Sequence, residues 1–169
     1  LLGSTPRQGD LPGATDTVHN YYENLVIDRD LQIIGSGISG TIIDGGGLDV
    51  VIDIQHSMTA VSDVMITDLS LRNGDSQLGG GIRSVNSNYI DKPEIVLERV
   101  RIHDNASSNE GGGILADRSN LMVTDSMFDQ NSAQYNGGGI YVSEANLRMD
   151  RVTISDNRSI AERGGGAVM

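Results

Sequence analysis

The sequence predicts an all-β protein, a single-stranded right-handed parallel β-helix (solenoid) of about five coils with three short strands per coil. Two observations lead to this fold class. A GGGI run recurs at residues 79–82, 111–114 and 137–140, with related glycine runs at 45–47 and 164–166, so that successive runs begin 26 to 34 residues apart. No segment keeps a 3.6-residue apolar period over three turns, which argues against helices.

Apolar residues have the same spacing before several asparagines. Counting back from Asn105, Asn131 and Asn157, mostly apolar residues stand ten, eight, five and three positions earlier. With one residue deleted, Asn73 fits the same pattern. A spacing of two indicates a strand with one face inward, and the step of three indicates a bend. The GGGI segment supplies a third strand, so each repeat describes one coil.

Stacked coils explain why the apolar positions recur. Equivalent residues of successive coils would lie ~4.8 Å apart, the strand spacing within a sheet. Columns such as Ile95, Leu121 and Leu147 then become continuous interior ladders. An array of antiparallel hairpins is the rival fold. The repeat of about 26 residues is too long for it, and Asn-Gly turns between paired runs are missing.

The asparagine and glycine columns have structural explanations. An Asn tolerates the left-handed conformation at a bend, and its side-chain amide can bond to the Asn of the next coil. A Gly allows positive φ or a close approach of backbones at a second corner. We predict these structural roles for Asn73, Asn105, Asn131, Asn157, Gly80, Gly112 and Gly138.

The chain divides into two parts by composition. Residues 1–24 mix Gly, Pro, Thr and Asp without a period, and we interpret them as an irregular lead-in or an N-terminal cap. Residues 25–169 carry the β-helix repeats. The chain begins with Leu rather than Met, so we expect the repeats to continue in a longer parent protein.

Charge and composition exclude some partners. Twelve basic and 23 acidic residues give a net charge of −11, which disfavours nucleic acid and anionic membrane surfaces. There is no Cys, so disulfides and thiolate metal sites are excluded. No run of ~18 apolar residues exists, so no transmembrane helix is predicted.

One recurring set of carboxylates is a candidate metal site. Asp104, Asp129 and Asp156 recur near the asparagine column. Stacked carboxylates ~5 Å apart repel each other, and a Ca²⁺ between coils would relieve the repulsion. A solvated acidic face is the alternative. No other cofactor is expected.

No catalytic residue is predicted. The clustered carboxylates of glycoside hydrolases are missing, and Lys92 is the single lysine that could act as a lyase base. His103 precedes Asp104, but a general base here is disfavoured because the equivalent positions of other repeats hold unrelated residue types. The question of an enzyme stays open, with a non-enzymatic protein favoured.

The runs TIIDGGGLDVVIDI (41–54) and VMITDLSLRNG (64–74), with the repeated GGGI and F/I-x-x-N, resemble a known family. They are similar to right-handed parallel β-helices of bacterial surface proteins, namely the CSLREA-type repeat proteins and the polymorphic outer-membrane autotransporters. The resemblance covers residues 25–169. It implies an extracellular or cell-surface location and a pectin-lyase-like fold.

The resemblance implies a non-enzymatic module that acts as an adhesin, a binding scaffold or a structural stalk. Its partner would be a host surface, a glycan or a protein. Because polysaccharide lyases and hydrolases share the fold, a polysaccharide-active enzyme or a carbohydrate-binding relative is the first alternative. The last glycine run opens a coil that the chain does not finish, so a self-assembling extracellular polymer with end-to-end association is the second.

Overall fold

All regular elements of the computed structural model are β-strands. The structure describes residues 19–22, 24–57, 61–87, 91–161 and 165–169, and these contain no helix, hence none able to cross a membrane. The strands are β1 (His19–Tyr22), β2 (Leu25–Ile27), β3 (Leu31–Ile34), β4 (Thr41–Asp44), β5 (Ile52–Gln55), β6 (Val64–Arg72), β7 (Asp75–Ser76), β8 (Ile82–Val85), β9 (Glu94–His103), β10 (Ala106–Ser107), β11 (Ile114–Asp117), β12 (Asn120–Thr124), β13 (Met127–Asp129), β14 (Ser132–Ala133), β15 (Ile140–Ser143), β16 (Leu147–Asp150), β17 (Thr153–Ser155) and β18 (Arg158–Ser159).

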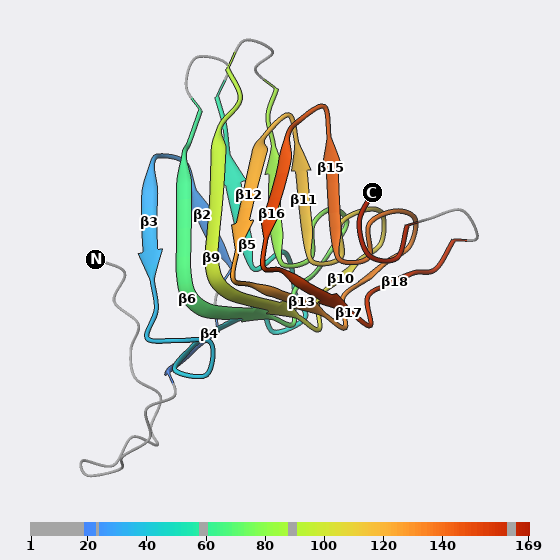
Figure 1. The fold of residues 1–169 in the computed structure, drawn as a ribbon, viewed down its shortest axis with the longest axis horizontal. Coiled ribbons are helices and arrows are strands. Elements are labelled where there is room, and N and C mark those ends of the chain that lie inside the picture. Colours follow the sequence, from blue (N-terminus) through green and yellow to red (C-terminus); the bar gives the residue numbers. More distant parts are fainter. Residues whose placement is uncertain (1–18, 23, 58–60, 88–90, 162–164) are drawn as a thin grey trace.

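The strands form three sheets, and every described pairing is parallel. Sheet A contains β1, β3, β4, β6, β9, β12, β13, β16 and β17; sheet B contains β2, β5, β8, β11 and β15; sheet C contains β7, β10, β14 and β18. Figure 1 shows the chain winding through them as stacked turns. The predicted fold class is confirmed: the protein is a parallel β-solenoid of about five turns.

One turn runs from sheet B through sheet A to sheet C. In the fourth turn, for example, the chain passes through β11, β12, β13 and β14 before β15 begins the next turn. Sheet A is bent, and in β6 and β9 a single strand crosses the bend. The bend residues have positive φ in four consecutive turns: Asp68, Arg99, Asp125 and Arg151.

The interior is filled by the apolar columns that the spacing predicts. Ile95 pairs in register with Leu121, which pairs with Leu147. Ile95 and Leu121 are fully buried, whereas Leu147 in the last full turn is only partly buried. Phe128 is the largest fully buried side chain and lies level with Ile102. Continuous packing from turn to turn therefore makes one elongated core.

The predicted lead-in meets the solenoid at one strand. Residues 1–18 and 23, which make up most of the 1–24 segment, lie outside the described residues. Residues 19–22 form β1, which pairs in parallel with β4. Residues 19–22 of this segment therefore add a parallel strand at the edge of sheet A, beside β4.

Candidate functional site

The asparagine corner is a buried hydrogen-bonded ladder. The Nδ2 of Asn105 donates to Oδ1 of Asn131 (3.0 Å), and the Nδ2 of Asn131 donates to Oδ1 of Asn157 (2.9 Å). The same two oxygens accept the backbone N–H groups of Asn105 and Asn131. Asn105 and Asn131 are each only 1% exposed. The amides thus satisfy backbone groups that the bend removes from the sheet.

Asn73 does not belong to this ladder. The register of β6 and β9 places Asn73 level with Asp104, and both have positive φ, 56° and 54°. Gly74 stands beside Asn105, and its N–H donates to Oδ1 of Asn105 (2.8 Å). The alignment of Asn73 with the later asparagines is therefore wrong by one residue. The left-handed residue at this corner is the one before the ladder Asn.

The glycine corner is set by a close approach of backbones. The predicted residues Gly80, Gly112 and Gly138 stack on one another, whereas the positive φ values belong to the glycines before them, Gly79, Gly111 and Gly137. A Cβ on Gly112 would lie 2.3 Å from the carbonyl oxygen of Ser132 and 2.4 Å from that of Gly138. Only glycine fits this position without moving the backbone.

The first glycine run lies at the other corner of the coil. β5 pairs with β8 so that Val51, not a glycine, is level with Gly81. Residues 45–47 instead follow β4, and the N–H of Gly47 donates to the carbonyl of Asn73 (2.7 Å). The same Gly-Gly-Gly sequence thus occurs at two different bends of the coil.

The three aspartates of the candidate calcium site have different surroundings. Asp104 and Asp156 follow the ends of β9 and β17, with Gln130 between them in the stack. Asp129 lies on β13, level with His103, and both its carboxylate oxygens accept from Arg101 (2.9 and 2.6 Å). This hydrogen-bonded guanidinium holds the pKa of Asp129 below its usual range.

These carboxylates do not converge in the structure. One oxygen of Asp104 lies 2.6 Å from Nδ1 of His103. Within the part of the chain that the structure describes, no three His, Cys, Asp or Glu side chains are arranged to hold a metal ion. A shared calcium site does not fit this donor set, and the calcium prediction rests on the sequence alone.

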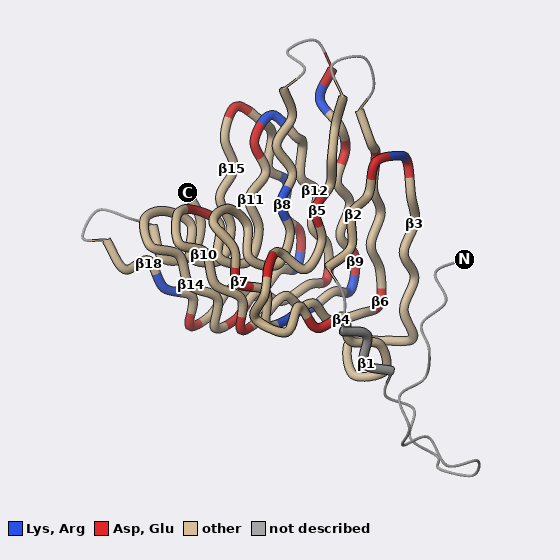
Figure 2. Tube along the Cα trace, turned by 180° about the vertical axis from the view of Figure 1, so that it is seen from behind, with Lys and Arg blue, Asp and Glu red and all other residues tan. Residues whose placement is uncertain are grey.

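Five outward carboxylates elsewhere are paired at hydrogen-bond distance with an arginine of a neighbouring turn. Figure 2 shows charged residues mainly along the bends and strand ends. The inter-turn pairs are Asp44–Arg72, Asp53–Arg83, Asp68–Arg99, Asp129–Arg101 and Asp125–Arg151. At Asp53, burial raises the pKa, but hydrogen bonds from Arg83 and Gln55 outweigh it and the pKa is lowered. Charge along these columns is therefore largely compensated.

An acidic row at the start of the sheet A strands is different. We use "acidic row" for Asp30, Asp63 and Glu94, which are level in register just before or at the start of β3, β6 and β9. The N–H of Asp63 donates to Asp30 Oδ1 (2.9 Å), and the N–H of Glu94 donates to Asp63 Oδ1 (2.8 Å). No Lys or Arg pairs with these carboxylates among the described residues.

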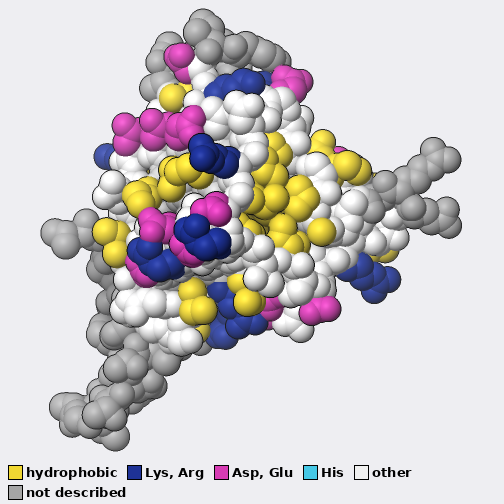
Figure 3. Space-filling model, viewed as in Figure 1, with side chains coloured by type: hydrophobic (Ala, Val, Ile, Leu, Met, Phe, Trp, Pro, Cys, Tyr) yellow, Lys and Arg dark blue, Asp and Glu magenta, His cyan; other side chains and the backbone are white. Residues whose placement is uncertain are grey.

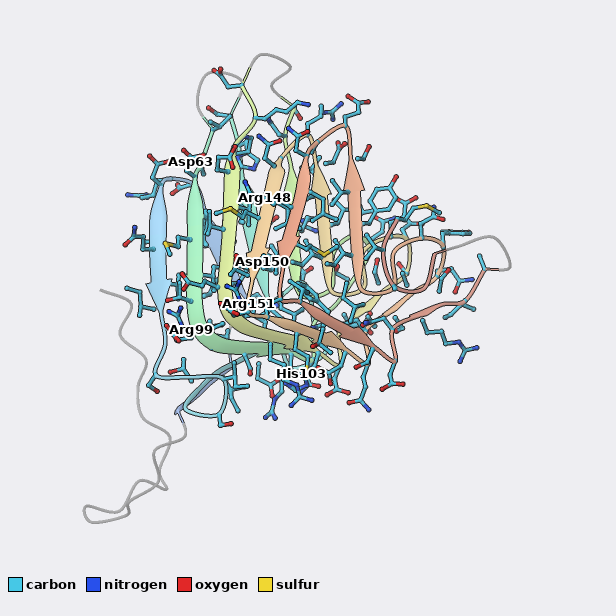
Figure 4. All side chains as sticks on the ribbon, viewed as in Figure 1. Asp63, Arg99, His103, Arg148, Asp150 and Arg151 are labelled. Carbon is cyan, nitrogen blue, oxygen red and sulfur yellow. The ribbon has the colours of Figure 1, made fainter. Side chains whose placement is uncertain are left out.

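An apolar stripe runs beside the acidic row. It consists of Met65, Val96 and Met122, which are level in register on β6, β9 and β12 and point outward. Gln32 and Arg148 continue the column at its two ends. Figure 3 shows acidic side chains at the upper left of this face with hydrophobic side chains beneath them. Figure 4 places Asp63 and Arg148 on the same face.

A hollow of about 320 Å³ lies where the acidic row and the apolar stripe meet. Its lining residues come from β3, β6, β9 and the residues just before them: Asp30, Leu31, Gln32, Asp63, Val64, Met65, Glu94 and Val96. The sequence reasoning missed both rows. Each row is marked in the sequence by the type of residue at one equivalent position of successive repeats. These positions can be identified only after the strand register is known.

The remaining histidine with a described partner belongs to the solenoid wall. Nε2 of His56 lies 2.8 Å from Ser84 Oγ, which lies 2.8 Å from Ser119 Oγ. Nδ1 of His56 accepts the N–H of Ser62 (3.1 Å), so the ring is neutral with its proton on Nε2. Ser84 and Ser119 are fully buried, so this Ser–His contact offers no nucleophile to a substrate.

Lys92 also has a structural contact. Its Nζ donates to the backbone carbonyl of Glu144, two turns away (2.5 Å). Its side chain thus ties a loop of the third turn to the fifth turn. This contact gives Lys92, which stands two residues before Glu94, a role in holding the turns together.

One family model matches the chain. The Chlamydia polymorphic membrane protein repeat matches residues 125–143. This segment runs from the sheet A bend through Phe128, the ladder residue Asn131 and the glycine corner into β15. No curated protein and no solved structure is significantly similar to the chain. The match and the solenoid together fit a β-helix surface protein, while the likeness to CSLREA-type and pectin-lyase-like proteins stays a prediction.

Proposed function

We propose that the chain is a non-enzymatic binding module displayed outside the cell, acting as an adhesin or a binding scaffold. The observation that carries this proposal is the match to a repeat of outer-membrane surface proteins over residues 125–143. These residues include the two features that build a turn, the Asn ladder and the glycine corner. The repeat likeness therefore concerns the architecture of the stack itself.

The distribution of polar groups supports a binding role. The titratable groups with described ion pairs are mostly committed to partners in adjacent turns, as Arg101 is to Asp129 (2.6 Å). Such pairs link the outward surfaces of successive turns to one another. A rigid elongated stack can present these faces at a distance from a membrane without needing disulfides or a cofactor.

The location is tested on intact cells that produce the full-length protein. Antibodies against residues 25–169 should label intact and permeabilised cells equally, and external protease should remove the label. A cytoplasmic marker should be labelled only after permeabilisation. Labelling of the solenoid only in permeabilised cells would contradict surface display.

The non-enzymatic role is tested separately. The purified 169-residue chain should bind immobilised host glycans or matrix proteins without producing new reducing or unsaturated ends from acidic polysaccharides. Release of such ends above a buffer control would replace the proposal by the polysaccharide-active alternative.

A further inference from the structure

The outer face of sheet A over β3, β6 and β9 combines three features that occur together at one place. It has a hollow of about 320 Å³, at the lower end of the ~300–1,000 Å³ typical of ligand pockets. The half-buried Met65 and Val96 line it with apolar surface. The acidic row borders it with carboxylates that form no ion pair with Lys or Arg among the described residues, although Asp63 acts electrostatically on His56.

In the acidic row, three carboxylates stack in successive turns without an ion pair to Lys or Arg among the described residues. In five other outward contacts between turns, an Asp meets an Arg at hydrogen-bond distance. Here two aspartates and a glutamate are level in successive strands, at the ~4.8 Å strand spacing. Like charges directly opposite each other on a sheet are destabilising. A cation supplied from outside would relieve that repulsion.

Each carboxylate keeps one oxygen for such a cation. Asp30 and Asp63 each use Oδ1 to accept a backbone N–H, and Glu94 uses Oε1 to accept from Asn120 Nδ2 (2.8 Å). These bonds fix the side chains at the rim of the hollow. A preorganised rim reduces the side-chain entropy that a partner would lose on binding.

The charge and the shape together select the partner. The apolar stripe lies two residues along the strands from the acidic row, or roughly 7 Å. A long basic side chain carries both matching surfaces, an alkyl stem and a charged head. A bare metal ion would use only the carboxylates, and an acidic or neutral glycan would leave the carboxylates uncompensated.

We propose that this face docks a basic segment of a partner protein, whose Lys or Arg stems lie over Met65 and Val96 while their charged heads pair with the acidic row. The inference rests on the proposed binding function and names its partner chemistry.

The test uses the 169-residue chain and a short peptide of alternating Lys and Val, with the Glu counterpart as the negative probe. We expect the Lys peptide to bind in a salt-sensitive manner and the Glu peptide not to bind. The variant Asp30→Asn/Asp63→Asn/Glu94→Gln should weaken binding about tenfold while keeping every hydrogen-bond acceptor. Val96→Thr should weaken it about threefold without changing the salt dependence.

The matched control changes the same charge elsewhere. Asp49→Asn/Asp75→Asn/Asp156→Asn alters three exposed carboxylates away from the hollow and should leave the affinity within about twofold. An equal loss in both triple variants, or no binding of the Lys peptide, would overturn the proposal. If spermine binds as tightly as the peptide, the site takes small polycations instead; if unlabelled chain competes for it, the occupant is a second copy.

Separate results would contradict the proposed surface function and the proposed docking site. Loss of surface labelling on cells with intact peptide binding would remove the surface function and leave the docking site. Surface labelling with no effect of the acidic-row variant on peptide binding would do the reverse.

Discussion

Two Gly-Gly-Gly runs, residues 45–47 and residues 111–113, have different structural roles in this solenoid. Residues 111–113 pack closely on the following turn, where two carbonyl oxygens, of Ser132 and Gly138, lie within 2.5 Å of a would-be Cβ on Gly112. Residues 45–47 lie at the opposite corner, and a Cβ on Gly46 would have no atom within 4 Å. Gly46 is needed only for its positive φ of 65°.

The difference shows that a repeated motif does not guarantee a repeated position. What defines a turn here is which backbone groups meet, and this is set by strand register. The asparagines behave in the same way, since Asn131 bonds along the stack whereas Asn73 donates its amide to Asp44 (2.9 Å). The following expectations test this contrast, from the largest effect to the smallest.

The largest effect is expected at the glycine corner. Gly112→Ala places a methyl group against two backbone carbonyls that cannot rotate away, so we expect a loss of about 3 kcal/mol in the free energy of unfolding. Urea unfolding followed by circular dichroism measures it. Gly46→Ala is the control and should cost about 1 kcal/mol, the penalty of a left-handed Ala. Equal losses would show that the two runs are equivalent after all.

The Asn ladder comes next. Asn131→Ala removes the acceptor for two N–H groups of Asn105 and the donor to the carbonyl of Ile102 (2.9 Å). These groups are buried, so we expect a loss of about 2 kcal/mol, measured in the same unfolding assay. Asn73→Gly keeps the positive φ and gives up one partly exposed contact, so a loss under about 1 kcal/mol is expected. A larger loss for Asn73→Gly would contradict the register.

A smaller effect is expected for the buried ion pair. Asp129→Asn should cost about 1 kcal/mol at pH 7, because the Asp129 side chain is only 9% exposed and takes both Arg101 bonds. Arg101 lowers the pKa of Asp129, so its contribution is present above the ordinary carboxyl pKa near 3.9 and is lost as the pH falls through the folded value. The variant should therefore lose less stability than the wild type below about pH 4.

The exposed pair Asp125–Arg151 supplies the comparison for Asp129. Asp125→Asn should leave the melting temperature unchanged, since both side chains are more than a third exposed. Equal acid profiles for the Asp129 variant and the wild type would show that the Arg101 contact does not stabilise the fold.

The smallest expected effect is a change in how steeply the melting temperature varies with pH when His56 is replaced. Burial lowers the pKa of His56, although Asp53 and Asp63 act in the opposite direction. The unfolded chain therefore takes up this proton first, and stability falls as the pH drops from about 6.5 toward the folded pKa. His56→Gln should flatten the melting-temperature profile over that window and leave it parallel to wild type above pH 7. An unchanged slope would contradict the burial of the ring.

The sequence was sufficient for the fold because the interior is periodic. The spacing of apolar residues before Asn105, Asn131 and Asn157 reports which side chains point inward. Those before Asn105 and Asn131 lie in the core, whereas at the end of the stack Leu147 is only partly buried and Met149 is 41% exposed. The sequence was insufficient to place Asn73 and residues 45–47. Aligning repeats by residue type alone does not reveal that Asn73 is shifted by one residue, or that residues 45–47 lie at a different bend of the coil. The pairing of β6 with β9 and of β4 with β6 corrects both.

The surface was harder to predict for a physical reason. The two-residue strands of sheet C, such as Ala106–Ser107 and Ser132–Ala133, have no alternating apolar pattern because small residues pack there. The acidic row mixes Asp with Glu and continues as Asn120, so no single letter marks it. The residue type at an outward position depends on its neighbours in other turns. Those neighbours are far apart in the sequence, so they are not known until the strand register is known.

The bend of sheet A has a consequence for how turns find their neighbours. Its residues alternate in sign along the axis: Asp68, Arg99, Asp125, Arg151. Because the apolar columns of successive turns are nearly alike, core packing discriminates weakly between correct and shifted pairings. A shift by one turn would set Asp on Asp and Arg on Arg at this bend, where like charges oppose pairing. Like-charge repulsion at this column would therefore oppose a slip by one turn, whereas a slip by two turns would restore the Asp–Arg pairs.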